Sequence, residues 1–339
     1  MEHGGRRVTS KDVALAAGVS QQTVSRILSG NAPAMVSEVT RQRVQRLAAE
    51  LGYVPNAAAR QLRQRRANAL GLMLPSAGQH ITAFYSFTQL LTGIAEEAEA
   101  TGYTLVICPG GAPQQQVKLI RTGQVDGALV MLPLVDDPRL AELARIGAPT
   151  VWMNEPPEGV PVSWVDFDNV AAARGAVTHL LARGHRRVGF IGWAGLLNAE
   201  LRLRGYREAL VSHGLAPDEE LVVRAPEPRE ATRGAEAMRQ LLALARRPTA
   251  VFCSGDFLAF GAMHVAQAAG LRLPDDLAIV GVDDEPASAY QRPPLTTVRP
   301  PFRAKGRAAA RLLIDLIEGR VVAPAARRLP TELIVRESS

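Results

Sequence analysis

The sequence has few of the features that mark secreted or membrane-spanning proteins. Only two cysteines, Cys108 and Cys253, occur in 339 residues, and both lie inside apolar runs. A disulfide framework is therefore excluded, and two reduced, buried thiols are expected. No apolar run approaches the ~18 residues that a membrane span requires, and the first residues are polar and charged. We therefore expect a cytoplasmic protein with no membrane partner.

Motifs for catalysis and for cofactor binding are missing as well. No GxGxxG, P-loop, GxSxG or HExxH pattern occurs, and the six histidines are scattered. The glycines of GFIGWAG are spaced as turn glycines rather than as a dinucleotide loop, and the acidic cluster VDDE has no partner residues that would complete a metal site. We expect no cofactor, no metal and no enzymatic activity.

Positive charge is concentrated at the start of the chain. Residues 1–66 carry eleven lysines and arginines against four acidic residues, a net charge of +7, whereas the remainder carries 28 basic and 29 acidic residues. A solvated basic arm is the plain alternative. A basic segment that also folds is typical of a domain that binds a polyanion.

The basic segment has the pattern of a helix-turn-helix. An apolar face at 13–17 predicts a first helix, Gly18 permits a tight turn, and Ser20 is suited to cap a second helix with apolar residues at 24, 27 and 28. A third helix is expected from about Ser37 to Gly52. An ordinary helical hairpin with a polar face remains the alternative.

The second helix would expose polar side chains that can contact bases. If residues 24, 27 and 28 face inward, then Gln21, Gln22, Ser25 and Arg26 lie on the outer side. Glutamine can bond an adenine edge and arginine a guanine edge in the major groove. Together with the local charge, this arrangement predicts a DNA-binding headpiece over residues 1–54.

A short basic segment, residues 55–67, follows the headpiece. It holds one large apolar residue, Leu62, among several arginines, and it is too short and too charged to be helical alone in water. We expect this hinge to become ordered on DNA and to insert Leu62 into the minor groove. A merely basic linker is the alternative.

From residue 68 onward, strand-like and helix-like runs alternate, which predicts parallel sheets covered by helices and divided into two lobes with a ligand cleft at the strand ends. The expected strands are 69–74, 103–108, 126–132, 149–154, 187–192, 220–225, 249–254 and 277–284. The expected helices are 87–100, 115–122, 139–146, 169–182, 203–213, 232–245 and 257–269.

Six stretches resemble, in order, motifs of the lactose-repressor (LacI/GalR) family of bacterial transcription regulators: VTSKDVALAAGVSQQTVSRIL, ELGYVPNAAARQL, LLARGHRRVGFIG, RLRGYREAL, LPDDLAIVGVDD and PPLTTVRP. The resemblance implies an all-α helix-turn-helix headpiece and an α/β core of two doubly wound parallel-sheet lobes of periplasmic-binding-protein type I. It implies a core over 68–339, with a first lobe of about 68–164 and 299–325 and a second of about 165–298 and 326–339.

The resemblance also assigns residues to two sites. The residues implied to contact DNA are Thr9, Ser20, Gln21, Gln22, Ser25, Arg26, Ser37, Thr40, Asn56, Ala59, Leu62 and Arg63. The residues implied to contact an effector are Ser76, Phe167, Asp168, Arg202, Arg229, Asp256 and Asp283. A guanidinium and a carboxylate facing each other across a cleft suit a polyhydroxylated ligand.

Two departures from the family pattern bear on the effector. Gly255-Asp256 stands where members commonly have Asn-Asp, and Arg229 lies near the position of a ligand-stacking aromatic residue. Short stretches are faintly similar to gluconate-type regulators. An extra cation in the cleft would suit a sugar acid.

We therefore expect a homodimeric, sequence-specific transcription regulator, a repressor, that binds an inverted-repeat operator in double-stranded DNA and responds to a sugar or sugar acid. The alternatives are a regulator with a degenerate or non-sugar pocket, a sugar-binding transport component, and an enzyme with a regulatory headpiece.

Overall fold

The computed structural model describes residues 8–28, 36–54, 66–75, 85–108, 110, 113–132, 137–226 and 230–339. The chain divides into two compact units, residues 1–66 and 67–339. No helix within the described ranges is long and apolar enough to cross a membrane.

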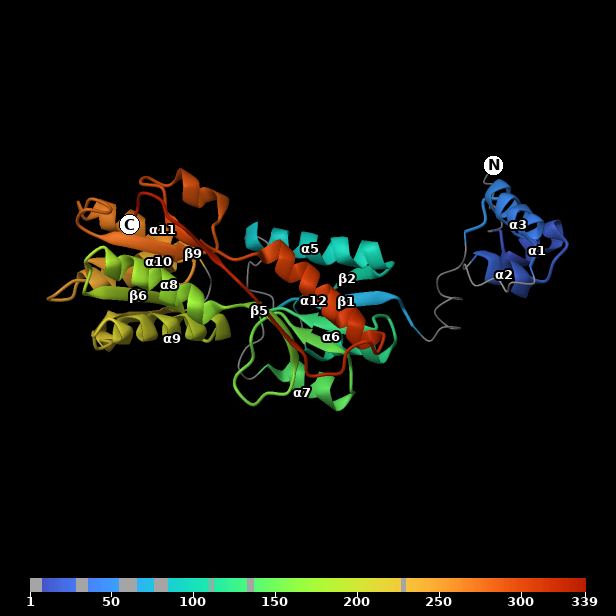
Figure 1. The fold of residues 1–339 in the computed structure, drawn as a ribbon, viewed down its shortest axis with the longest axis horizontal. Coiled ribbons are helices and arrows are strands. Elements are labelled where there is room, and N and C mark those ends of the chain that lie inside the picture. The colour runs from blue at the N-terminus through green and yellow to red at the C-terminus, as the bar shows by residue number, and fades with distance from the viewer. Residues whose placement is uncertain are drawn as a thin grey trace. The chain divides into compact units, whose positions relative to one another are not determined.

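The described residues of the first unit form three short helices (Figure 1), which pack around a small apolar core. They are α1 (Ser10–Ala17), α2 (Gln21–Leu28) and α3 (Glu38–Glu50). Val13, Val24 and Val44 are fully buried, one from each helix, as the apolar spacing predicted. Gly18 ends α1 in the left-handed conformation, with φ of 63°, which glycine adopts without steric cost. The expected helix-turn-helix is therefore present.

The second unit contains two lobes, each built on a sheet of six strands among the described residues. The first sheet has the order β11-β5-β4-β3-β1-β2, and its pairs are parallel. Its strands are β1 (Ala69–Met73), β2 (Thr104–Cys108), β3 (Gly127–Val130), β4 (Thr150–Trp152), β5 (Ser163–Phe167) and β11 (Ala326–Leu329). The first lobe adds the helices α5 (Tyr85–Thr101), α6 (Pro113–Arg121), α7 (Pro138–Arg145) and α12 (Phe302–Ile317).

The sheet of the second lobe has the order β12-β10-β9-β8-β6-β7 and is parallel except for the pair β10–β12. Its strands are β6 (Val188–Trp193), β7 (Val222–Ala225), β8 (Ala250–Cys253), β9 (Ala278–Val282), β10 (Thr296–Arg299) and β12 (Glu332–Ile334). Its helices are α8 (Asn169–Ala182), α9 (Leu197–Ser212), α10 (Ala231–Leu242) and α11 (Asp256–Ala268), with the short 3-10 turns η2 (Glu219–Leu221) and η3 (Pro286–Tyr290).

The chain passes between the lobes three times: after β5, after β10 and after β11. Two of the lobe boundaries expected from the sequence are therefore displaced. The first lobe continues to Phe167 rather than to residue 164, and it also takes residues 326–329, which were expected in the second lobe. The reason is the parallel ladder between β11 and β5, which pairs Ala326 with Trp164 and Leu329 with Phe167.

Helices α5 and α12 pack side by side on the first lobe (Figure 1). A Cβ at Gly93 of α5 would overlap the backbone carbonyl of Arg303, so glycine is required where the two helices approach. Beside this contact, Arg303 and Arg307 of α12 donate hydrogen bonds to Glu96 of α5. These hydrogen bonds lower the pKa of Glu96 to about 2, and the one from Arg303 has the larger effect.

Candidate effector pocket and nucleic-acid interface

In the headpiece, α2 buries Val24 and Ile27 and exposes Gln21, Gln22 and Arg26. The helix therefore presents two amides and a guanidinium on one outer side. These groups are suited to base edges in the major groove, where amides match adenine and guanidinium matches guanine.

Residues with hydroxyl side chains lie at the N-termini of the three headpiece helices. The Thr23 N–H donates to Ser20 Oγ (3.0 Å), and the Thr40 N–H donates to Ser37 Oγ (3.2 Å). Thr9 donates from its hydroxyl to the Asp12 carboxylate at 2.7 Å. The predicted N-cap role of Ser20 is thus confirmed. Because helix N-termini attract phosphates, these positions suit contacts to the DNA backbone.

The Gln21 amide is held by α1. Its Nε2 donates to Ser10 Oγ at 2.7 Å, across eleven residues of sequence. That bond fixes the orientation of the amide, and with it the direction of the second N–H and of Oε1. An amide N–H and an amide oxygen are the pair of groups that glutamine uses to recognise adenine. Ser10 was not predicted as a site residue.

Several predicted site residues lie outside the part of the chain that the structure describes. These are the hinge residues Asn56, Ala59, Leu62 and Arg63 and the effector residues Ser76 and Arg229.

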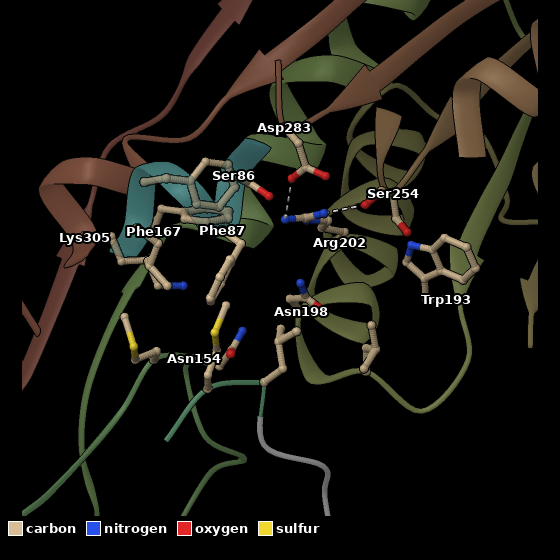
Figure 2. A pocket seen from close by; sticks show the side chains of 16 residues that line it. Ser86, Phe87, Asn154, Phe167, Trp193, Asn198, Arg202, Ser254, Asp283 and Lys305 are labelled. Carbon is tan, nitrogen blue, oxygen red and sulfur yellow. Dashed lines mark hydrogen bonds and ion pairs between the residues drawn. The ribbon is translucent and has the colours of Figure 1, made fainter. Parts of the chain in front are cut away.

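In the second unit, a pocket opens between the two lobes at the C-terminal ends of the strands (Figure 2). This position is the one that parallel α/β sheets favour for ligands. The first lobe contributes Ser86, Phe87, Leu90, Met131, Leu132, Met153, Asn154, Phe167, Phe302 and Lys305, and the second contributes Trp193, Leu196, Asn198, Arg202, Ser254 and Asp283.

Arg202 lies at the centre of the pocket wall (Figure 2). Its Nε donates to Asn169 Oδ1 at 2.9 Å, its Nη1 donates to the Ser254 carbonyl, and its Nη2 lies 3.9 Å from Asp283 Oδ1. The side chain is almost completely buried, and burial lowers the pKa of Arg202 while Asp283 acts to raise it. The guanidinium is therefore fixed, with a carboxylate beside it that can accept from a ligand hydroxyl.

The Asp283 backbone is strained, with φ of 117° in a region that non-glycine residues rarely adopt. Its N–H donates to the Val298 carbonyl at 2.9 Å. The next residue, Asp284, accepts from Arg299 and Arg336, both at 2.6 Å. These bonds hold the loop after β9 so that the carboxylate faces the pocket.

A buried ion pair lies on the opposite side of the pocket. Lys305 Nζ donates to Asp166 Oδ1 at 2.6 Å and also sits 4.9 Å from the ring centroid of Phe167. Both charged groups are nearly inaccessible to solvent. The pocket thus holds two cations, and each has a carboxylate nearby.

Two polar atoms of the pocket residues are buried and have no hydrogen-bond partner among the described residues. They are Asn154 Oδ1 and Ser254 Oγ. Burying such atoms without a partner is costly, so they are suited to contact a bound molecule. Trp193 adds an aromatic surface across the pocket from Lys305 (Figure 2).

Of the predicted effector residues, Phe167, Arg202 and Asp283 line this pocket. Asp168 and Asp256 do not. Asp168 caps α8 by accepting from the Ala171 N–H at 2.8 Å. Asp256 is fully buried and accepts from Thr297 Oγ1 (2.6 Å). Burial raises the pKa of Asp256, and nearby Asp283 adds to the increase. Both carboxylates therefore accept hydrogen bonds from other groups of the protein.

Sequence reasoning did not identify Asn154, Trp193, Asn198, Ser254 or Lys305 as pocket residues. Ser254 directly follows β8, and Asn154 is two residues beyond the end of β4, so their positions at strand ends were a signal that could have found them. Lys305 lies on α12, a helix that was not expected.

A helix-turn-helix unit joined to a two-lobed core with a cleft at its strand ends defines a ligand-responsive DNA-binding regulator. Residues 9–56 match the model of bacterial regulatory proteins of the lacI family, and residues 177–339 match that of a periplasmic-binding-protein-like domain. The chain is 38% identical over 340 residues to the HTH-type transcriptional regulator CelR of Thermobifida fusca, covering 98% of each protein. It is 36% identical to the HTH-type transcriptional repressor CytR of Escherichia coli (strain K12), covering 98% of this chain and 96% of that one.

Solved structures agree. A complex of the transcriptional regulator CelR with cellobiose has a TM-score of 0.76 at 36% identity, covering 98% of this chain and all of that one. The lac repressor dimer bound to operator and the anti-inducer ONPF has a TM-score of 0.85 at 29% identity, covering 98% and 99%. The chain belongs to the lacI family of bacterial regulatory proteins, and it is a transcription regulator rather than an enzyme, as the sequence predicted.

Proposed function

We propose that this regulator is a cytoplasmic homodimeric repressor that binds an inverted-repeat operator and is controlled by a neutral saccharide in the inter-lobe pocket. The observation that carries the proposal is the pocket itself. It joins a fixed guanidinium and a strained aspartate from one lobe with the Asn154 amide oxygen from the other, which has no hydrogen-bond partner among the residues that the structure describes. Donors and acceptors on opposite walls suit a ligand with many hydroxyl groups.

Charge favours a neutral ligand over the sugar acid that the sequence suggested. Lys305 is paired with Asp166, and Arg202 has Asp283 beside it. Neither cation is left for a ligand carboxylate, and a buried anion without a partner would be costly. The relative CelR is described in complex with cellobiose, which is a neutral disaccharide.

The proposed mechanism links the lobes to the hinge. In one arrangement of the core, the hinges of two copies lie close, become helical and insert Leu62 into the minor groove; in the other they separate. A saccharide shifts this balance only through its different affinity for the two arrangements. Two recognition helices about one turn of DNA apart explain the expected inverted repeat.

A mobility-shift titration tests the proposal. The full-length protein is titrated against the DNA upstream of its own gene and against random duplex, with and without cellobiose. We expect a preference for the upstream DNA that cellobiose changes. Equal binding to both duplexes under all conditions would refute the proposed function.

Calorimetry tests the charge argument separately. Cellobiose and its aldonic acid are titrated into the protein under the same conditions. We expect the neutral sugar to bind more tightly, and tighter binding of the acid would restore the sugar-acid hypothesis.

A further inference from the structure

Glu285 connects the two lobes next to the pocket. It follows the loop after β9 in the second lobe, and its side chain reaches the start of α5 in the first lobe. Its Oε2 accepts from the Tyr85 N–H at 3.1 Å, and its Oε1 accepts from the Ser86 N–H at 3.2 Å. Glu285 is 5% exposed. The contact is therefore a carboxylate cap that one lobe provides for a helix of the other.

The start of a helix is a favourable place for this carboxylate. The first N–H groups of α5 have no partner inside the helix, and the helix dipole makes that end partly positive. Burial raises the pKa of Glu285, while the N–H groups of Ser86 and Tyr85 act to lower it. The two amide bonds thus compensate for taking the carboxylate out of water.

Glu285 is rigidly attached to its own lobe. Its backbone N–H donates to Asp256 Oδ2 at 2.8 Å, and the same carboxylate accepts from Ser288 Oγ at 2.7 Å and from Thr297. Asp256 was expected to contact an effector, but it instead fixes the loop that carries Glu285. The position of α5 relative to the second lobe is therefore set through a chain of buried hydrogen bonds.

The same elements form two walls of the pocket. Ser86, which donates to Glu285, lines the pocket from the first lobe, as does Phe87. Asp283, two residues before Glu285, lines it from the second lobe. Any change in the angle between the lobes that separates these walls must break or lengthen the bonds from Glu285 to α5.

We propose that Glu285 is an inter-lobe positioning residue, which caps α5 from the second lobe and thereby holds the walls of the effector pocket in the arrangement described here. Because it favours one lobe arrangement, it also sets how strongly effector binding is coupled to operator binding; this second part rests on the proposed function. Glu285 is not itself among the residues lining the pocket, so its effect on a ligand is exerted through Ser86 and α5.

Hydrogen exchange at single-residue resolution tests the cap without DNA or effector. In Glu285→Ala, the amide hydrogens of Tyr85 and Ser86 should exchange about tenfold faster, because a hydrogen bond to a charged acceptor is lost. Glu285→Gln keeps one acceptor oxygen and should restore part of the protection. Glu337→Ala removes an exposed carboxylate of the same lobe and should change neither amide.

The result must be local to support the proposal. Faster exchange at the start of α5 with unchanged protection of β8 and β9 supports a positioning role. Unchanged exchange at Tyr85 and Ser86 would overturn it, and so would a uniform loss of protection in both lobes, which indicates simple destabilisation.

Calorimetry with cellobiose as the probe adds a functional arm. Glu285→Ala should raise the dissociation constant by about tenfold, since the assembled pocket is less populated, whereas Glu337→Ala should leave it unchanged. A wild-type protein that binds no cellobiose contradicts the proposed effector, and the exchange experiment then still decides the role of Glu285. Equal cellobiose affinity in wild type and Glu285→Ala would overturn the link to the pocket.

Discussion

Replacing Lys305 by methionine should destabilise the core by about 3 kcal/mol. Removing one partner of a buried ion pair typically costs ~3–5 kcal/mol, because the remaining charge is left without compensation. Asp166 keeps three other donors, the N–H groups of Glu155 and Phe167 and the Asn169 side chain, which places the loss near the lower end. Methionine keeps the volume of the lysine stem, so a cavity does not add to the effect.

The measurement is urea unfolding followed by tryptophan fluorescence, since Trp152, Trp164 and Trp193 all lie in the second unit. A double-mutant cycle with Asp166→Asn separates the ion pair from other effects, and we expect a coupling of about 2 kcal/mol. A loss below about 1 kcal/mol for Lys305→Met, or strictly additive effects in the cycle, would refute the view that this pair is a coupled structural element.

Three further predictions concern the headpiece and the packing of α5. Arg26→Ala should reduce the preference for one base pair in each half-site by about 1–3 kcal/mol and leave the salt dependence nearly unchanged, as measured by anisotropy with operator variants. Ser10→Ala should weaken discrimination at the position that Gln21 contacts by about threefold to tenfold, whereas Ser10→Thr should keep it; equal base profiles would exclude this role. The pKa of Glu96 is lowered to about 2 from 4.5 by hydrogen bonds from its arginine partners on α12, so its contribution to stability is present above pH 4.5 and is lost as the pH falls towards 2. Thermal unfolding of wild type and Glu96→Gln should therefore differ near neutral pH and converge in acid; a difference that persists in acid would contradict the assignment.

Strong apolar patterns were predictable from the sequence. The buried strands β1, β3, β8 and β9 and the amphipathic headpiece helices lie within a few residues of their expected bounds. The strands β5, β10, β11 and β12 were missed, as was α12. Strand β11 has the sequence ARRL at residues 326–329 and is mostly exposed, so no apolar pattern indicates a strand there. These residues form a strand because they pair with β5 at the edge of the sheet.

The pocket shows a similar limit. Arg202 and Asp283 could be assigned to the effector site from the sequence motifs in which they occur, and both line the pocket. Asp256 lies beside them in space, but its carboxylate is turned inward, where Gly281 leaves room for it. An acidic residue at the end of a strand is predicted from the sequence to lie near a cleft. The direction of its side chain, however, depends on partners that are distant in sequence, such as Thr297.

The three passages between the lobes have a consequence for folding during synthesis. The first lobe includes α12 and β11, which are translated only after nearly all of the second lobe has emerged. The sheet of the first lobe therefore cannot be completed at the edge of β5 until most of the second lobe has been synthesised. Such non-local pairing favours slow folding. Helices α1 to α3 have no such dependence, so the nascent chain acquires its DNA-binding part well before the part that regulates it.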